Sequence, residues 1–135
     1  MIDKLTGVHP ELVIKIKQIL AAMAALGFPM MVVQGLRTAE AQAALYAQGR
    51  TKPGKIVTNC DGIKTKSNHQ AKADGFGHAV DLAFIDDPRT PVNETWDEQL
   101  WHQAGPAYGA CAKALGLVWG GDWKSITDRP HVELL

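Results

Sequence analysis

The amino-acid sequence predicts an α+β fold in a single domain that spans residues 1–135. At 135 residues the chain is within the size range of one domain and long enough to bury a real core. Its hydrophobic content of 46% is ordinary for a globular protein. Helical and strand patterns follow one another without the regular alternation of a parallel α/β sheet, which favours the α+β class.

The N-terminal part predicts a helix, a strand and a second helix. Pro10 suits the first helical position, and Gly27 suits a left-handed C-cap. Between them, apolar side chains recur at spacings of three and four residues: Leu12, Ile16, Ile19, Leu20, Met23 and Leu26. The run "PMMVVQGL" is typical of a strand. Thr38 can then cap a second helix, "AEAQAALYAQ", which ends at Gly49.

The middle of the chain, residues 50–77, is mostly polar loop. Only "KIVTN" predicts a strand there, and a loop this long inside a compact domain is usually functional or disordered. After this loop, "HAVDLAF" predicts a strand, and "DDPRTPVNET" has the composition of a turn.

The C-terminal part predicts a third helical region and two closing strands. The helical region begins near Trp96, is interrupted by Gly105-Pro106 and resumes to Leu115. "GLVWGGDW" and "PHVELL" then predict two strands separated by a turn.

Charge and cysteine content exclude several classes of protein. Fourteen basic and fourteen acidic residues cancel, so no basic excess indicates a nucleic-acid partner, and affinity for an anionic polymer would have to come from local geometry. Two cysteines, Cys60 and Cys111, are expected to be unpaired thiols of a protein made in reducing cytoplasm. The start of the chain lacks the apolar core of a signal peptide, and the longest apolar run, "AAMAALGF", is too short for stable membrane insertion.

The segment "HAVDL" places a carboxylate inside a strand. Strand side chains alternate, so Gly77, Ala79 and Asp81 share one face, and the two small residues leave room beside the carboxylate. A buried carboxylate must be paired, protonated or bound to a metal. An aspartate that caps a turn or holds an arginine is the alternative.

The C-terminal segment "DRPHVELL" adds a histidine and two acids. His131 and Glu133 share a strand face, and Asp128 lies three residues before His131, with Pro130 fixing the backbone between them. If His131 binds a metal, an aspartate three residues earlier can reach the water on that metal without binding the metal itself. A core histidine near the chain end is the alternative reading.

Arg37 in "QGLRT" lies where a strand meets a helix, and its guanidinium can hold a carboxylate or a developing oxyanion. An arginine on the surface is the alternative. Taken together, these residue types match a zinc hydrolase site, with two imidazoles, one carboxylate, a position left for water and a separate acid.

Three motifs in this order resemble the M15 family of zinc peptidases. The motifs are Ser67-Asn68-His69, Gly77-His78-Ala79-Val80-Asp81 and Asp128-Arg129-Pro130-His131, and "GLRT" with Gln42 lies upstream of them. The resemblance is strongest to phage and bacterial L-alanyl-D-glutamate endopeptidases, which cut peptidoglycan stem peptides, and extends to D-alanyl-D-alanine carboxypeptidases of the VanY type.

The resemblance implies a role for each matched residue. His69, Asp81 and His131 would bind Zn²⁺, Asp128 would be general base and acid, and Arg37 would stabilise the tetrahedral intermediate or orient the substrate. Ser67 and Gln42 would support the site or contact the substrate. The implied fold is a small antiparallel sheet flanked by helices, of the Hedgehog/DD-peptidase type, with zinc on the open face of the sheet.

The chain departs from the compact family motif by a longer spacer. Seven residues, Gln70–Phe76, separate His69 from Gly77, where the compact motif has two. We expect this excursion to loop out beside the metal and to form part of the substrate cleft. His78 is the alternative ligand, but strand alternation turns it away from the face of Asp81. Asp74 is a weaker alternative because Asp-Gly is typical of a turn.

Several further residues have expected places. The four tryptophans, Trp96, Trp101, Trp119 and Trp123, are expected in the core rather than as sugar-stacking platforms, and Trp123, close to the site, is the candidate among them for substrate contact. Glu133 is either a second candidate base or a partner of a histidine ligand. His9 is expected at the surface or as a helix cap, and His102 is expected to pack. A structural zinc site at the two cysteines is a further alternative.

The resemblance also implies partners and a place of action. We expect a monomeric enzyme, made in the host cytoplasm without a signal peptide, that acts on peptidoglycan stem peptides of the cell wall (periplasm) after holin-dependent release, as phage or prophage endolysins do. No nucleic acid is expected as a partner. A D-alanyl-D-alanine carboxypeptidase on the same scaffold and a non-catalytic, zinc-containing module that binds cell wall are the alternative functions.

Overall fold

The computed structural model describes residues 4–85 and 94–134. In chain order its elements are α1 (Pro10–Ala25), β1 (Met30–Gln34), α2 (Ala39–Ala47), β2 (Ala79–Ile85), β3 (Glu94–Thr95), α3 (Glu98–Ala114), β4 (Val118–Trp119), the short 3₁₀ helix η1 (Gly120–Asp122) and β5 (His131–Glu133). This order confirms the α+β class. Within the described ranges, no helix is both long and apolar enough to cross a bilayer.

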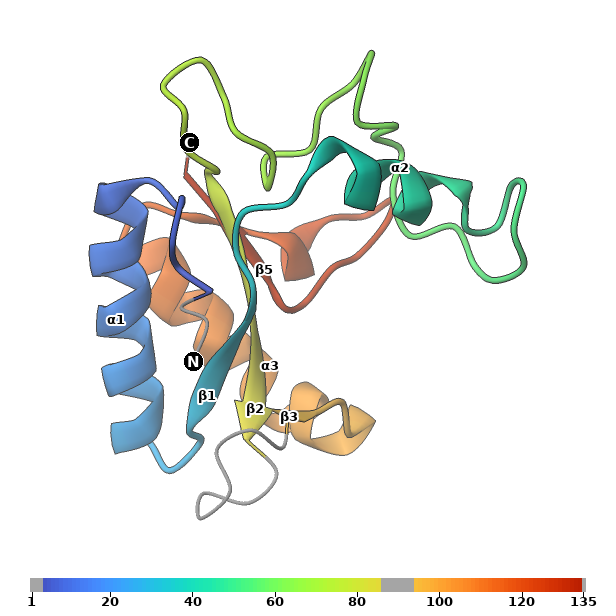
Figure 1. Ribbon diagram of the computed structural model, residues 1–135. Helices are drawn as coiled ribbons and strands as arrows, with labels where there is room; N and C mark the ends of the chain where they lie inside the picture. The colour runs from blue at the N-terminus through green and yellow to red at the C-terminus, as the bar shows by residue number, and fades with distance from the viewer. Residues whose placement is uncertain (1–3, 86–93, 135) are drawn as a thin grey trace.

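The strands form one antiparallel sheet in the order β1-β2-β5-β4, with β3 paired to β2. Figure 1 shows β2 in the middle of the molecule, α1 and α3 beside it, and α2 with the long loops towards one end. In the β2–β5 ladder, Asp81 lies directly opposite His131. The sheet therefore places two of the predicted site residues next to each other.

Alternation along β2 separates the core from the site. Val80, Leu82 and Phe84 are buried in the hydrophobic core with side chains of α1 and α3, among them Leu12, Ile16, Met23, Trp101 and Tyr108. Each large apolar side chain buried in this way stabilises the fold by roughly 1.5–3 kcal/mol. Successive strand residues point to opposite faces, so Asp81 is turned away from this core.

The predicted helix ends are confirmed. Pro10 begins α1, and the Nδ1 atom of His9 caps it by accepting a hydrogen bond from the backbone N–H of Glu11. Gly27 follows α1 with a φ of 89°, a left-handed conformation that favours glycine. Thr38 caps α2 through its hydroxyl oxygen.

Two expectations about secondary structure and one about packing are wrong. Residues 55–59, "KIVTN", form no strand, and Ile56 and Val57 are 49% and 41% exposed because no neighbouring strand pairs with them. Helix α3 runs unbroken through Gly105 and Pro106, and Pro106 is tolerated on its exposed side. His102 on the same helix is exposed rather than packed. The predicted turn over 86–93 lies outside the described residues.

Candidate metal centre and cleft

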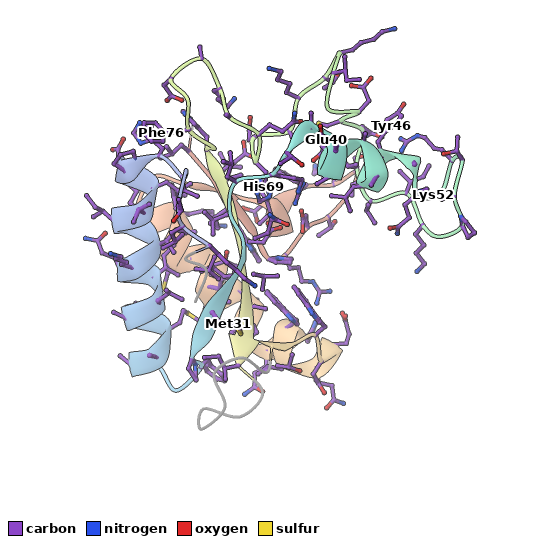
Figure 2. All side chains as sticks on the ribbon, viewed as in Figure 1. Met31, Glu40, Tyr46, Lys52, His69 and Phe76 are labelled. Atoms are coloured by element: carbon purple, nitrogen blue, oxygen red, sulfur yellow. The ribbon has the colours of Figure 1, made fainter. Side chains whose placement is uncertain are left out.

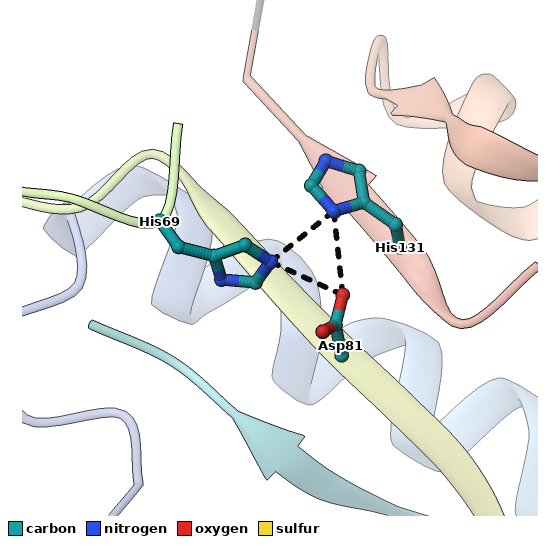
Figure 3. Close-up of side chains that lie close together, drawn as sticks. All are labelled: His69, Asp81 and His131. Carbon is teal, nitrogen blue, oxygen red and sulfur yellow. Dashed lines mark hydrogen bonds and ion pairs between the residues drawn. The ribbon is translucent and has the colours of Figure 1, made fainter. Parts of the chain in front are cut away.

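Three side chains direct one donor atom each to a common point. His69 Nε2 lies 3.2 Å from Asp81 Oδ1, and His131 Nδ1 lies 3.3 Å from the same oxygen. The two imidazole nitrogens are 3.2 Å apart. Figure 3 shows His69 reaching in from a loop, Asp81 from β2 and His131 from β5. The structure thus brings together the three residues that were predicted to bind zinc.

Backbone contacts and small residues hold His69 in place. Its carbonyl oxygen accepts a hydrogen bond from the Arg37 N–H at 2.8 Å. A Cβ atom at Gly77 would lie 2.9 Å from that carbonyl oxygen, and a Cβ atom at Gly35 would lie 2.0 Å from the carbonyl oxygen of Lys4. Glycine at 77 therefore allows a close approach to the His69 loop, and glycine at 35 allows a close approach to the backbone of Lys4.

Hydrogen bonds fix which nitrogen of each ring faces the centre. His69 Nδ1 lies 2.9 Å from the Gly35 carbonyl oxygen, which can only accept, so Nδ1 carries the proton. His131 Nε2 lies 2.6 Å from Glu133 Oε1, a carboxylate oxygen, so Nε2 carries the proton there. In the neutral rings, His69 Nε2 and His131 Nδ1 then point unprotonated lone pairs at each other and at Asp81.

This arrangement fits a tetrahedral divalent cation. Zinc bonds to nitrogen and carboxylate oxygen of about 2.0–2.2 Å at tetrahedral angles require donor atoms about 3.3–3.5 Å apart, close to the separations found here. Asp81 Oδ1 is buried without a hydrogen-bond donor in the described part of the chain, so it is free to bind a metal. Three facing lone pairs would repel one another unless a positive charge lies between them.

The ionisation of the centre supports the same conclusion. Burial lowers the pKa of His131, but Asp81 and Glu133 outweigh burial and raise that pKa to about 9. Burial opposes the ionisation of Asp81, but the nearby imidazoles of His131 and His69 outweigh it and lower the pKa of Asp81 below the usual range. The residues therefore favour a positive charge at this point, which either a proton on His131 or a bound metal ion supplies.

Glu133 contacts His131 and does not face the common point. Its Oε2 atom accepts a hydrogen bond from the side-chain amide of Asn68, so both carboxylate oxygens are engaged. Burial opposes its ionisation, and the bond to His131 lowers the pKa of Glu133. Of the two expected places for Glu133, the geometry favours that of a histidine partner. Sequence reasoning missed Asn68, whose role depends on a residue far along the chain.

Arg37 and Gln42 form a network beside the centre. Arg37 Nη2 lies 3.7 Å from Asp81 Oδ2, and Arg37 Nη1 donates to Gln42 Oε1 at 2.8 Å. Gln42 is fully buried, and its amide nitrogen donates to Thr58 Oγ1 at 3.2 Å and to the Cys60 carbonyl oxygen at 2.9 Å. Gln42 therefore connects the arginine to the loop that forms one wall of the cleft.

Asp128 lies near the three donors without joining them. Its Oδ2 atom is 3.8 Å from His131 Nδ1. Burial, together with the negative charge of Asp81, raises the pKa of Asp128, while His131, His69 and Arg37 oppose this shift. A Cβ atom at Gly120 would lie 2.3 Å from the Asp128 carbonyl oxygen, so only glycine allows this close approach.

Ser67 supports the His69 loop from within. Its hydroxyl oxygen accepts a hydrogen bond from the His69 N–H, and its own N–H donates to Gln70 Oε1. Gln70 is 5% exposed and donates its amide to the Gly62 carbonyl oxygen. Sequence reasoning missed Gln70 because it reads as the first residue of a polar loop.

A cleft of about 900 Å³ opens onto this centre. His69, His131, Asp128 and Ser67 line it, as does Trp123, which is 36% exposed with its ring 4.9 Å from the ring of His131. Trp123 therefore lies in the cleft beside the three donors. Trp96 also lines the cleft and is 50% exposed, so the expectation that it belongs to the core is wrong, whereas Trp101 and Trp119 are buried.

The excursion Gln70–Phe76 takes no part in the cleft lining, which corrects the expectation for it. The ring of Phe76 instead packs edge-on against the ring of His9, and the Gly77 N–H pairs with the Gly7 carbonyl oxygen. Figure 2 shows Phe76 close to the start of α1 and separate from His69. Because the excursion packs against His9 and Gly7 near the start of α1, it lies away from the metal centre.

His78 and Asp74 belong to that separate cluster. His78 Nε2 lies 2.7 Å from Asp74 Oδ2, and Asp74 Oδ1 accepts from the Phe76 N–H, as in the expected Asp-Gly turn. Neither residue joins the three donors. The two cysteines are also separate from them: Cys111 Sγ contacts Met23 Sδ at 4.0 Å, whereas Cys60 lines the cleft.

Comparison with known proteins identifies the family. Residues 61–134 match a family model of M15 peptidases described as D-alanyl-D-alanine carboxypeptidase. Over 96% of its length, the chain is 34% identical to the peptidoglycan L-alanyl-D-glutamate endopeptidase CwlK of Bacillus subtilis (strain 168), of which the match covers 75%. The chain belongs to the M15 peptidase family.

Solved structures agree with this M15 assignment. The L-Ala D-Glu endopeptidase ChiX of Serratia marcescens superposes with a TM-score of 0.62 at 29% identity, over 98% of this chain and 84% of that one. A Zn(II) complex of the vancomycin-resistance D,D-pentapeptidase VanY superposes with a TM-score of 0.58 over 94% of this M15 peptidase and 72% of that chain. At 17% identity, the likeness to VanY shows the fold alone.

Proposed function

We propose that this M15 peptidase hydrolyses peptidoglycan stem peptides in a zinc-dependent reaction, and that it cuts the bond between L-alanine and D-glutamate. The convergence of His69 Nε2, Asp81 Oδ1 and His131 Nδ1 within 3.3 Å carries the proposal of a metal enzyme. The choice of bond is supported by two relatives named for it, CwlK and ChiX, whose alignments cover 96% and 98% of this chain.

The three donors would hold a zinc ion, which supplies a Lewis acid that polarises the peptide carbonyl and lowers the pKa of water. Asp128 lines the cleft, and its Oδ2 atom lies 3.8 Å from His131 Nδ1, too far for a hydrogen bond, so the carboxylate is free to move a proton. It accepts the proton of the attacking water and delivers it to the departing amine, which leaves one new carboxylate and one new amino group.

Arg37 supports this reaction from a position next to Asp81 Oδ2, the carboxylate oxygen that does not face the histidines. Burial lowers the pKa of Arg37 while Asp81 and Asp128 oppose that shift, and an arginine stays charged under such conditions. Held by Gln42, its guanidinium lines the cleft, where it stabilises the negative charge that develops on the carbonyl oxygen. Glu133 keeps His131 in the tautomer that presents Nδ1.

The test is digestion of purified muropeptides followed by mass spectrometry. Cleavage at the proposed bond produces peptides that begin with D-glutamate, with L-alanine left at the other new end. Asp128→Asn should keep stoichiometric zinc and lose turnover by about 10²–10⁴-fold, whereas His131→Ala should lose both. Asp122→Asn is the matched control, because Asp122 pairs with Lys113 away from the cleft lining. Near-normal turnover in Asp128→Asn would refute the assignment of the base.

A D-alanyl-D-alanine carboxypeptidase remains the second candidate, because the matching family model carries that description. The same spectra distinguish it, since a carboxypeptidase removes only the terminal D-alanine. A non-catalytic zinc module predicts bound zinc and no hydrolysis of either bond.

The proposal extends to the place of action. We propose that the enzyme acts on the cell wall as an endolysin of a phage or prophage, released with the help of a holin. Co-expression with and without a holin tests this, since lysis of the culture should require both proteins. Lysis by the peptidase alone would contradict holin dependence.

A further inference from the structure

Positive charge is concentrated in one segment of an otherwise acidic chain. Between residues 50 and 73 the only carboxylate is that of Asp61, but the segment contains six cations: Arg50, Lys52, Lys55, Lys64, Lys66 and Lys72. The whole chain has fourteen residues of each sign, so the remainder is net negative. This segment includes the loop that forms one wall of the cleft.

Two charged residues of this segment are committed to its own structure. The Arg50 guanidinium lies 3.9 Å above the ring of Tyr46 and donates to the Tyr46 and Thr58 carbonyl oxygens. Asp61 Oδ1 accepts the N–H groups of three consecutive residues, at 2.9, 2.9 and 3.1 Å. Of the lysines, Lys64 lies near the Asp61 carboxylate and Lys72 near that of Glu133. In the described part of the chain, Lys52, Lys55 and Lys66 form no ion pair with a carboxylate.

Lys55 and Lys66 are the two lysines that line the cleft. Both are exposed, and within the described residues neither ammonium group pairs with a carboxylate. The carboxylates in the cleft lining, Asp128 and Glu133, lie beside His131 at the metal end. The cleft therefore has charges of both signs at the metal centre, where Arg37 also lies, and a wall with two lysines that have no ion-pair partner in the described residues.

The proposed substrate supplies a matching charge. A glutamyl residue in a peptide chain uses its amino group for one peptide bond and only one of its two carboxyl groups for the next. Whichever carboxyl continues the chain, the other is a free carboxylate in the same residue whose amide is cut. An ammonium group in a partly enclosed cleft binds such a carboxylate by a charge-assisted hydrogen bond.

We propose that Lys55 and Lys66 bind the free carboxylate of the glutamyl residue and so determine specificity for the acid over its amide. This inference rests on the proposed function and deepens it. The two lysines are specificity-determining residues that leave the chemical step to Asp128 and the metal centre.

The test compares two peptides that differ only in that carboxylate, one with L-Ala–D-Glu and one with the free carboxylate converted to an amide. The zinc-loaded wild type should cut the acid with a kcat/KM about tenfold higher or more, and added salt should reduce this preference. Lys55→Met and Lys66→Met should each reduce the preference about fivefold by lowering kcat/KM for the acid alone. Lys66→Arg should retain it.

The matched controls come from the same segment. Lys52→Met and Lys64→Met remove equally exposed charges that do not line the cleft, and they should leave the preference unchanged. Figure 2 shows Lys52 at the far end of its loop, away from His69. The assignment would be overturned if the control variants reduced the preference for the acid as much as the cleft variants do. It would also be overturned if the cleft variants lowered kcat/KM equally for the acid and the amide.

Failure of the proposed function gives a different result. If the zinc-loaded wild type cuts neither peptide, the proposed reaction is wrong. Calorimetry then measures the binding of the two uncut peptides to the same protein. Tighter binding of the acid that is lost in Lys66→Met would support the carboxylate site, and equal binding of acid and amide would refute it.

Discussion

Replacing Gln42 with methionine should destabilise the protein by about 2–4 kcal/mol. Methionine keeps most of the volume of this fully buried side chain but removes its hydrogen bonds. The bond to the charged Arg37 contributes roughly 1.5–3 kcal/mol and the bond to the Cys60 carbonyl oxygen roughly 0.5–1.5 kcal/mol. The Thr58 hydroxyl adds little, because it keeps a second bond from the Cys60 N–H.

Urea unfolding of the zinc-free protein measures this change without the contribution of bound metal. Gln48→Met is the control: its amide makes one hydrogen bond, to the Lys55 carbonyl oxygen, in an exposed position, and its loss should cost less than about 1 kcal/mol. Gln42→Glu should lose less than Gln42→Met, because it keeps an acceptor for Arg37. A Gln42→Met variant within about 0.5 kcal/mol of wild type would refute the network as a source of stability.

Three further changes test other parts of the structure. Glu133→Gln should weaken zinc binding about 10- to 100-fold in chelator competition, because the imidazole that Glu133 holds loses its charged partner; unchanged affinity would contradict this. Backbone N–H groups hold the pKa of Asp61 below its usual value, so its contribution to stability is present above about pH 4 and is lost as the pH falls further. Asp61→Asn should therefore flatten the fall in unfolding free energy between about pH 5 and 2, and a parallel fall in both proteins would count against the contact. Gly109→Ala should lower Tm because its Cβ atom would lie 2.3 Å from the ring of Trp119, whereas Gly105→Ala in the same helix meets only an ordinary contact and should raise Tm; the reverse order would disprove the packing argument.

The parts of the fold that follow local rules were predictable from the sequence. Pro10, Gly27 and Thr38 act at helix ends through short-range geometry, and they lie where the prediction placed them. The face of Asp81 was predictable for a similar reason, since alternation along a strand needs only the strand itself. The roles of Asp128, Arg37 and the three donors are still predictions.

The parts that depend on distant partners were not predictable. "KIVTN" has the composition of a strand, but a strand needs a neighbour, and Ile56 and Val57 meet a cleft instead. Asn68 reads as a variable residue between Ser67 and His69, because its partner Glu133 is brought close only by folding. The excursion was misplaced in the same way, since the aromatic surface of His9 that it covers belongs to the other end of the chain.

The two imidazoles present different nitrogens to the centre, and this sets which donors a protein engineer can exchange at each position. The Nδ1 atom of His131 is as near to its backbone as the carboxylate oxygen of an aspartate, whereas the Nε2 atom of His69 matches the longer reach of a glutamate. Redesign of the donor set for another cation should therefore start with aspartate at 131 and glutamate at 69. With glutamate at 131 and aspartate at 69, the first side chain would be too long and the second too short to bind the same ion.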